Sequence, residues 1–187
     1  MEESGSEWEH PGGKLIELGP MSLKDEELLA ILIGSGYKGR SAQAIAKELL
    51  FKYYSIAGLL GKTSSDLSII KGLKDGKIAR IAASFEMVKR IFDGNKWEIP
   101  SRRLIKLELP ELSDVDLIAV LIGGRYKKKT AKDLSKELLD KFGSISGLMG
   151  QKLYKMAMIE GLGDVRVVRI AAALEVALRI VRALEKE

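Results

Sequence analysis

Apolar residues recur every three or four positions along most of the chain, which is the spacing of helices that pack one face on a core. The alternating Val-, Ile- and Thr-rich runs that mark strands are absent from the sequence. Acidic residues at 25–27 followed by apolar residues at 28–32 predict the start of a helix. Ser41 and Thr130 suit the N-cap position of a next helix. Long helices are expected at about 77–92 and 166–185, so the pattern predicts an all-α fold.

This pattern occurs twice, 89 residues apart. The shift aligns positions 8–91 with 97–180 without a gap. Of the 84 aligned residues, 37 are identical, where chance gives roughly 6%. The segment AILIG at 30–34, for example, returns as AVLIG at 119–123. The chain is therefore a tandem duplication.

The repeat divides the chain into four segments. We assign an acidic tail to 1–7, a first helical unit to 8–93, a linker to 94–100 and a second helical unit to 101–187. Short helices are expected near 55–60 and 64–70 of the first unit. The broad apolar arc of 167–184 predicts that the last helix is buried, against its own unit or against the other repeat.

Glycines cluster between the predicted helices. Gly161-Leu162-Gly163 separates an apolar helix end from Arg166 and Arg169, which is the pattern of a helix-hairpin-helix motif. Glycine lets the backbone approach a phosphate closely, and the next helix offers unpaired amides and the positive end of its dipole. Such a hairpin contacts the DNA backbone and reads no base edge. The motif therefore predicts DNA binding without sequence preference.

Further glycine loops with basic residues occur in both units. In the hairpin at Gly72, Lys74 stands where the second unit has Gly163, so a distorted or weaker hairpin is expected there. An earlier loop in each unit, at 34–41 and 123–130, also joins two predicted helices, and 125–129 is the densest positive patch of the chain. The candidate DNA-binding residues are Gly34, Gly36, Lys38, Arg40, Ser41, Gly72, Lys74, Lys77, Gly123, Gly124, Arg125, Lys127, Lys128, Lys129, Thr130, Gly161, Gly163, Arg166 and Arg169.

The first unit resembles the N-terminal region of the RadC family. The resemblance is carried by KLIELGP at 14–20, LKDEELLAIL at 23–32, the glycines and Ser at 36–42, AKELL at 46–50 and IKGL at 70–73. It covers essentially the whole first unit, and the second unit repeats it more loosely. It implies two tandem helix-hairpin-helix bundles of the kind seen in domain 2 of RuvA, a SAM-like fold. It also implies DNA binding and an association with DNA repair or recombination.

In that family this region is followed by a zinc-dependent JAB/MPN domain with a His-x-His site. The present sequence has a second helical unit in that place and contains no His-x-His. It contains no cysteine and one histidine, His10, which we expect to be a solvated tail residue. Thiolate chemistry is thereby excluded, and a histidine metal site or a Ser-His-Asp triad has almost nothing to be built from. We therefore expect no enzyme activity, no cofactor and no metal.

Two other catalytic interpretations fail on spacing. Gly61-Lys62-Thr63 resembles the end of a P-loop, but Ile56 stands where that motif needs its first glycine. A DNA glycosylase of this fold needs an aspartate about twenty residues beyond the hairpin. The second unit has no aspartate after Asp164, and in the first unit Asp93 lies at the junction of the units. Asp114 and Asp116 are better explained as residues at a helix start.

The net charge is +5, from 31 basic and 26 acidic residues, which mildly favours a polyanionic partner. No run of 18 apolar residues and no positive-then-apolar leader occurs, so we expect a cytoplasmic protein without membrane contact. Asn and Gln are rare beside Lys and Glu, as in many thermophile proteins.

The main alternative to DNA binding is a helical protein-interaction module, with a protein partner or self-association in place of DNA. No small-molecule substrate is expected in either case. An exposed apolar patch on 167–184 would favour the protein partner, and a basic face spanning both units would favour DNA.

Overall fold

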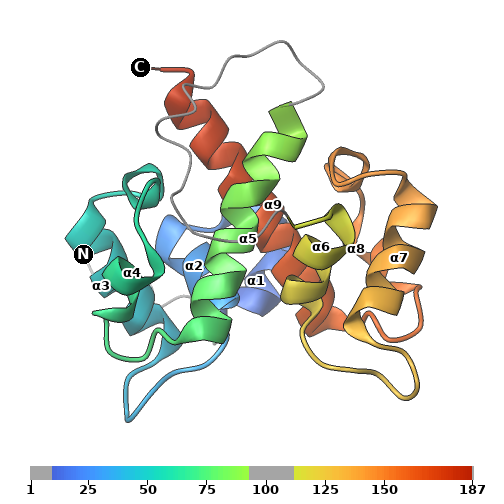
Figure 1. Ribbon diagram of the computed structural model, residues 1–187, viewed down its shortest axis with the longest axis horizontal. Coiled ribbons are helices and arrows are strands. Elements are labelled where there is room, and N and C mark those ends of the chain that lie inside the picture. The colour runs from blue at the N-terminus through green and yellow to red at the C-terminus, as the bar shows by residue number, and fades with distance from the viewer. Residues whose placement is uncertain (1–9, 93–111, 187) are drawn as a thin grey trace.

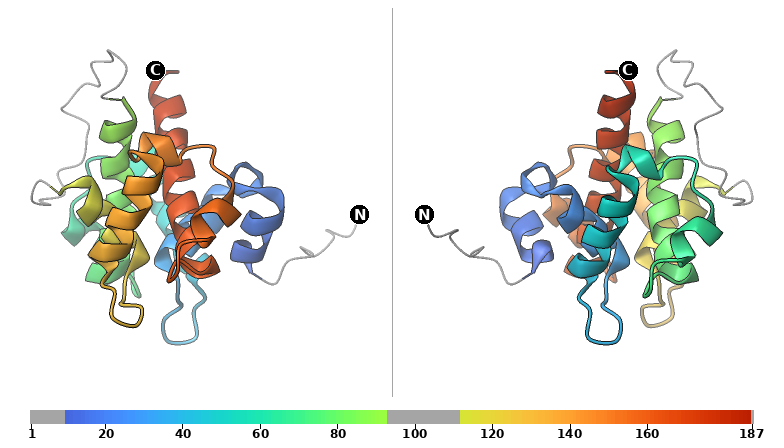
Figure 2. Two further views of the ribbon diagram at one scale, coloured as in Figure 1. Left: turned by 90° about the vertical axis from the view of Figure 1, so that its right-hand side faces the viewer. Right: turned by 90° about the vertical axis from the view of Figure 1, so that its left-hand side faces the viewer.

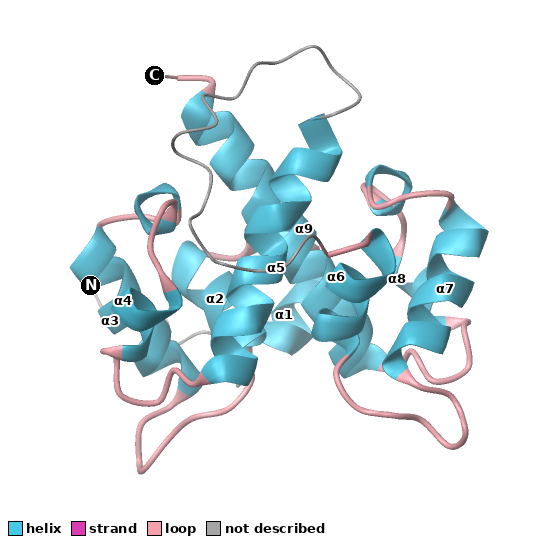
Figure 3. Ribbon diagram, viewed as in Figure 1, coloured by secondary structure: helices cyan, strands magenta, loops and turns pink. Residues whose placement is uncertain are grey.

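The computed structural model describes residues 10–92 and 112–186, and these residues form helices and no strand. The all-α fold class is therefore confirmed (Figure 3). The first unit contains α1 (Pro11–Leu18), η1 (Pro20–Ser22), α2 (Asp25–Ile33), α3 (Ala42–Tyr53), η2 (Ala57–Leu59), α4 (Ser64–Ser68) and α5 (Asp75–Phe92). The second unit contains α6 (Asp114–Ile122), α7 (Ala131–Phe142), η3 (Ser146–Leu148), α8 (Leu153–Ala157) and α9 (Asp164–Leu184).

Most helix starts agree with the sequence pattern. Ser41 caps α3, because its side chain accepts a hydrogen bond from the amide of Ala44, and Thr130 caps α7 through the amide of Asp133. The long helices α5 and α9 begin two residues earlier than expected. The expected helix near 55–60 is the single 3-10 turn η2, and α4 ends two residues short of 70. Helix α1 was not predicted, because Pro-Gly-Gly at its start is typical of a turn.

Four helices from both units form the centre of the molecule (Figure 1). Helices α5 and α9 pack on each other, α2 packs on α9 and α5, and α6 packs on α5 and α9. Each unit thus packs its long helix on the other unit as well as on its own. The last helix was expected to pack on its own unit or on the other repeat, and α9 packs on both. One continuous cluster of buried side chains runs through both units and includes Leu28, Phe85, Leu117 and Ile170.

Matching ion pairs join the two units at equivalent positions. Arg90 of α5 lies 3.4 Å from Asp114 and donates to the carbonyl of Leu112 at 2.6 Å. Arg179 of α9, 89 residues later, lies 2.5 Å from Asp25 and donates to the carbonyl of Leu23 at 2.7 Å. Within the two long helices, Glu86 also pairs with Arg90, and Glu175 pairs with Arg179. Each unit therefore contacts the other in the same way, as expected for an approximate two-fold relation.

His10 is exposed and precedes the first residue of α1. The acidic tail at 1–7 and the linker at 94–100 lie outside the described residues, so the boundaries of the four segments remain predictions.

Candidate nucleic-acid interface

The four glycine loops form two composite sites. Site 1 comprises the loop 34–41 and the hairpin 70–77, and site 2 comprises the loop 123–130 and the hairpin 159–166. A β-carbon on Gly72 would lie 2.8 Å from Cδ1 of Ile45 and 2.9 Å from Cβ of Tyr37, and one on Gly161 would lie 2.9 Å from Cδ1 of Tyr126. The tyrosine of each loop thus packs directly on the first glycine of its hairpin, where any side chain would displace it.

Both hairpins have the same conformation, so the distortion expected at Lys74 is not found. The φ angles of Gly72 and Gly161 are +102° and +103°. In both hairpins the amide after this glycine donates to the carbonyl three residues back, at 3.0 and 2.9 Å. The reason is that Gly163 has a φ of −72° and open space around its Cα, so a side chain such as that of Lys74 fits there.

The first cation of each long helix holds the neighbouring loop. Lys77 donates to the carbonyl of Ser35 at 2.6 Å, and Arg166 donates to those of Gly124 and Arg125 at 2.8 and 3.0 Å. Burial, together with repulsion from Arg80, lowers the pKa of Lys77. The expected DNA ligands Lys77 and Arg166 are therefore tied to loop carbonyls, and they position the loops as well as adding charge.

One turn further along, Arg80 and Arg169 bind the carboxyl ends of α2 and α6. Arg80 donates to Leu32 and Ile33, and Arg169 donates to Leu121 at 2.8 Å. Arg80 was not among the candidates from sequence. The 89-residue period could have identified it, because it aligns with Arg169.

The exposed cations differ between the two sites. At site 2, Lys127 forms an ion pair of 2.7 Å with Glu160, which raises the pKa of Lys127 and lowers that of Glu160. At site 1 the position of Glu160 is taken by Lys71. Lys38 and Lys74 are exposed there, and they form no ion pair within the described ranges. This difference in charge favours phosphate binding at site 1. The second glycine of the hairpin, which is present only at site 2, favours binding at site 2.

The remaining loop cations are partly neutralised. Arg40 pairs with Glu48 and also donates to the carbonyl of Lys71. Lys129 lies 2.8 Å from Glu137. Exposed positive charge at site 2 is therefore concentrated on Arg125 and Lys128, which form no ion pair among residues 10–92 and 112–186.

The loop glycines and hydroxyl groups have mostly structural roles. Gly34 and Gly123 end α2 and α6 with φ angles of +78° and +79°. Gly36 has no room for a side chain, because a β-carbon would lie 2.1 Å from the carbonyl oxygen of Arg40, whereas Gly124 is open. The hydroxyl groups of Ser41 and Thr130 are occupied as helix caps.

Asp75 and Asp164 stand at the first position of α5 and α9 and are exposed. The first amides of each helix have no partner within the helix and point toward the hairpin end. A carboxylate at this position interacts favourably with the helix dipole. It would also repel a phosphate that approaches the same amides. These two charges therefore oppose the phosphate contact that the glycine pattern predicts at this place.

Both sites lie at the same end of the molecule. The loops 34–41 and 123–130 project from one end in Figure 1, and the two side views agree (Figure 2). The starts of α5 and α9 lie at that end as well. A single extended partner can thus contact both sites.

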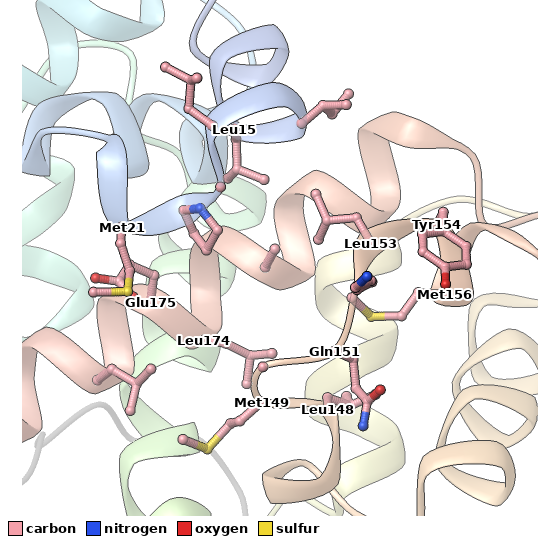
Figure 4. A pocket seen from close by; sticks show the side chains of 18 of the residues that line it. Leu15, Met21, Leu148, Met149, Gln151, Leu153, Tyr154, Met156, Leu174 and Glu175 are labelled. Atoms are coloured by element: carbon pink, nitrogen blue, oxygen red, sulfur yellow. The ribbon is translucent and has the colours of Figure 1, made fainter.

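An apolar groove of about 680 Å³ lies between η1, α8 and α9 (Figure 4). Its lining includes Leu18, Met21 and Tyr154, which are 57, 72 and 59% exposed. The floor includes Leu174 and the buried Glu175, whose carboxylate is paired with Arg179. The large exposed apolar side chains of the described residues lie outside 167–184, so the apolar patch on that helix that would favour a protein partner is not found.

No group of three metal-binding side chains occurs in 10–92 and 112–186. No helix in the same ranges is long and apolar enough to cross a membrane.

Comparison with known proteins identifies both units. The family model described as UPF0758 N-terminal, the RadC-like N-terminal region, matches residues 4–79 and again residues 91–168. This confirms the resemblance and the duplication. No solved structure matches the chain.

Curated relatives match over part of their length. A UPF0758 protein of Pseudoalteromonas atlantica is 40% identical over 45% of this chain and 38% of its own length. One from Clostridium botulinum is 38% identical over 44% and 36%. Another, from Leptothrix cholodnii, is 34% identical over 59% and 53%. The chain thus spans between about a third and a half of the relatives that it matches.

Proposed function

The chain belongs to the UPF0758 N-terminal family, which it matches twice, and we propose that it binds DNA without sequence preference. The observation that carries the proposal is the placement of two hairpin sites at one end of the molecule. Each site combines the first amides of a long helix with exposed cations, which are lysines at site 1 and lysines and an arginine at site 2. Amides at a helix start and flexible cations suit phosphate groups and carry no information about bases.

The test is a binding titration with single-stranded, duplex and four-way-junction DNA at two salt concentrations. The logarithm of the affinity should fall with the logarithm of salt concentration by about 0.9 per phosphate neutralised on duplex DNA. Exchanging the bases should leave the affinity unchanged. The absence of any salt dependence would contradict the proposal.

Charge reversal locates the contact. Lys38→Glu with Lys74→Glu should weaken binding at site 1, and Arg125→Glu with Lys128→Glu should weaken it at site 2. Lys186→Glu reverses one charge near the far end of α9 and is the control for net charge alone. If each double variant weakens binding by only twice the free energy that Lys186→Glu costs, only net charge matters and the hairpins have no special part.

We extend the proposal to a non-catalytic role in DNA repair or recombination, in the cytoplasm, on the strength of the RadC resemblance. Preference for the four-way junction over the duplex would support it. Cleavage of any of the three DNA substrates in the presence of Mg²⁺, Mn²⁺ or Zn²⁺ would contradict the non-catalytic part.

A second candidate function is self-association through the apolar groove. Its exposed Met21 and Tyr154 favour an apolar partner surface. Sedimentation should then show a dimer that Met21→Glu with Tyr154→Glu dissociates, while DNA affinity per chain stays the same. A monomer at all concentrations would exclude this function.

A further inference from the structure

Two arginines from different units meet between sites 1 and 2. Arg80 and Arg169 occupy equivalent positions of α5 and α9. Their Nη2 atoms lie 3.6 and 3.7 Å from the point where a β-carbon on Gly34 would stand. Nη1 of Arg169 lies 3.6 Å from the corresponding point on Gly123. The two side chains, which we call the central arginine pair, thus lie next to each other between the two loops.

This arrangement brings like charges together without a matching negative group. In the part of the chain that the structure describes, neither arginine forms an ion pair. Both are partly buried, and burial lowers their pKa values; repulsion from Arg169 lowers that of Arg80 further. Carbonyl groups at the ends of α2 and α6 compensate for only part of this charge.

One donor of the pair is left unused. Nε of Arg169 is buried and has no hydrogen-bond partner among the described residues. A buried donor without a partner is uncommon in native proteins and costs free energy. An anion beside the guanidinium groups would reduce the repulsion between the two arginines. Its negative charge would also attract the unpaired N–H group of Arg169.

We propose that the central arginine pair is the seat of one phosphate group. Planar guanidinium groups bind phosphate oxygens through paired N–H donors, and two of them can share one phosphate. Gly34 and Gly123 are exposed and carry no side chains, so the approach to the pair is open. The inference deepens the proposed function and rests on it, because a phosphate of bound DNA would occupy the seat between the two sites.

One carboxylate lies near the pair. Asp164 lines a hollow together with Gly34 and Arg169, a hollow whose lining does not include Arg80, and Asp164 forms no ion pair with either arginine within 10–92 and 112–186. The seat is therefore open to a ligand that competes with solvent and not with a protein carboxylate already bound.

The first test uses inorganic phosphate and the full chain. Phosphorus NMR of phosphate titrated with protein, in chloride of matched ionic strength, should show saturable binding of one phosphate per chain. The thermal midpoint should rise by roughly 3–5 °C at ten times the Kd. Absence of binding to the unaltered chain would overturn the proposal, whatever the variants do.

Variants assign the binding to the pair. Arg80→Gln and Arg169→Gln should each abolish most of the response to phosphate, and Arg80→Lys, which keeps the charge and loses the planar group, should retain part of it. Arg182→Gln is the matched control, an exposed arginine near the far end of α9 that should respond like the unaltered chain. An equal loss in Arg182→Gln would overturn the proposal.

Duplex DNA distinguishes the source of the phosphate. The quantity to compare is the slope of the logarithm of DNA affinity against the logarithm of salt concentration. Each single variant and the double variant should reduce its magnitude by the same amount, about 0.9, because the two arginines share a single phosphate. If inorganic phosphate binds and the slope is unchanged, the seat is supported and its ligand is a free phosphate compound. If phosphate binds and DNA does not, the proposed function fails and the seat remains.

Discussion

At the residue scale, each composite site depends on one glycine. The φ angle of Gly161 is +103°, and a β-carbon there would lie 2.9 Å from Cδ1 of Tyr126 and 3.0 Å from Cδ2 of Leu134. We expect Gly161→Ala to lower the free energy of unfolding by about 1–3 kcal/mol from the backbone strain, with the steric overlap in addition. Urea denaturation followed by circular dichroism measures the change.

The control for this substitution lies two residues away. At Gly163 the φ angle is −72° and the space is open, so Gly163→Ala should change stability by less than about 0.5 kcal/mol. Alanine restricts the unfolded chain but caps a helix less well than glycine, and these effects oppose each other. Equal destabilisation by both substitutions would show that the packing of Tyr126 on Gly161 has no energetic importance.

The carboxylates at the helix starts give a second prediction. Asp164→Asn should raise DNA affinity roughly two- to five-fold, which corresponds to the 0.3–1 kcal/mol typical of a charge at a helix terminus. The same substitution should slightly lower stability, because the negative charge no longer interacts with the helix dipole. Affinity by fluorescence anisotropy and stability by thermal melting should therefore move in opposite directions.

Asp140→Asn is the matched change for this measurement. It removes the same charge from an exposed position near the carboxyl end of α7, and it should leave the DNA affinity unchanged. Its stability should rise slightly, because a negative charge at that end of a helix opposes the dipole. If Asp140→Asn raises the affinity as much as Asp164→Asn, the effect belongs to net charge and the start of α9 is not a phosphate contact.

Sequence reasoning at this scale succeeded where a residue acts through its backbone. The pattern around Gly161 selected the correct turn, because only glycine adopts its backbone conformation freely. It did not separate cations that face solvent from those that bind loop carbonyls, such as Lys77 and Arg166, because that depends on loops more than 40 residues away. The neutralisation of Lys127 by Glu160 likewise cannot be predicted from the sequence, because only the fold brings the two residues together.

At the element scale, the capping boxes explain why α6 and α7 start where the sequence predicts. Ser113 and Thr130 each accept a hydrogen bond from the amide three residues on, and Asp116 and Asp133 bond back to them. These local patterns lie within four residues of each other, so they can be read without the fold. The start of α1 lacks a side-chain cap, and its helix was missed.

The cap of α6 predicts a dependence of stability on pH. Hydrogen bonds from Lys132 and Ser113 lower the pKa of Asp116 from 3.8 to about 2. Because the folded-state pKa is below the unfolded value, the stabilisation is complete above about pH 4 and is lost as the pH falls toward 2. The urea midpoint of the unaltered chain should therefore fall more between pH 5 and pH 2.5 than that of Asp116→Asn.

Salt distinguishes the two causes of this shift. The ion pair of Asp116 with Lys132 is exposed on the lysine side, so added salt should weaken its contribution to the lowered pKa of Asp116. The hydrogen bonds from Ser113 should persist. Parallel pH profiles for the unaltered chain and Asp116→Asn at low salt would contradict the assignment.

At the scale of the whole molecule, duplication has produced units that share a core. The sequence period gave the two units and their common helices, because identity at a fixed shift requires no knowledge of contacts. It left open whether α9 packs within its own unit. The answer depends on α5 and α6, which are separated from α9 by at least 40 residues of chain, and on the reciprocal pairs of Arg90 and Arg179.

The shared core predicts how the halves behave when they are separated. Residues 8–93 alone would expose the faces of α2 and α5 that otherwise pack on α9 and α6, and residues 101–187 alone would expose the matching faces. Newly exposed apolar surface favours association with another protein surface. Because the two units are equivalent, a second copy of α5 can take the place of α9. We therefore expect each half to be a dimer or to be unfolded, and never a stable monomer.

Mixing the halves completes the test. An equimolar mixture should form a one-to-one complex, seen by sedimentation, whose melting temperature rises with concentration, because folding and association are coupled. Arg90→Glu in the first half should weaken the complex, since its partner Asp114 is in the second, and Asp114→Arg in that half should restore part of it. Two monomeric halves that each melt near the temperature of the full chain would show instead that each unit is a domain of its own and that their shared core contributes little to stability.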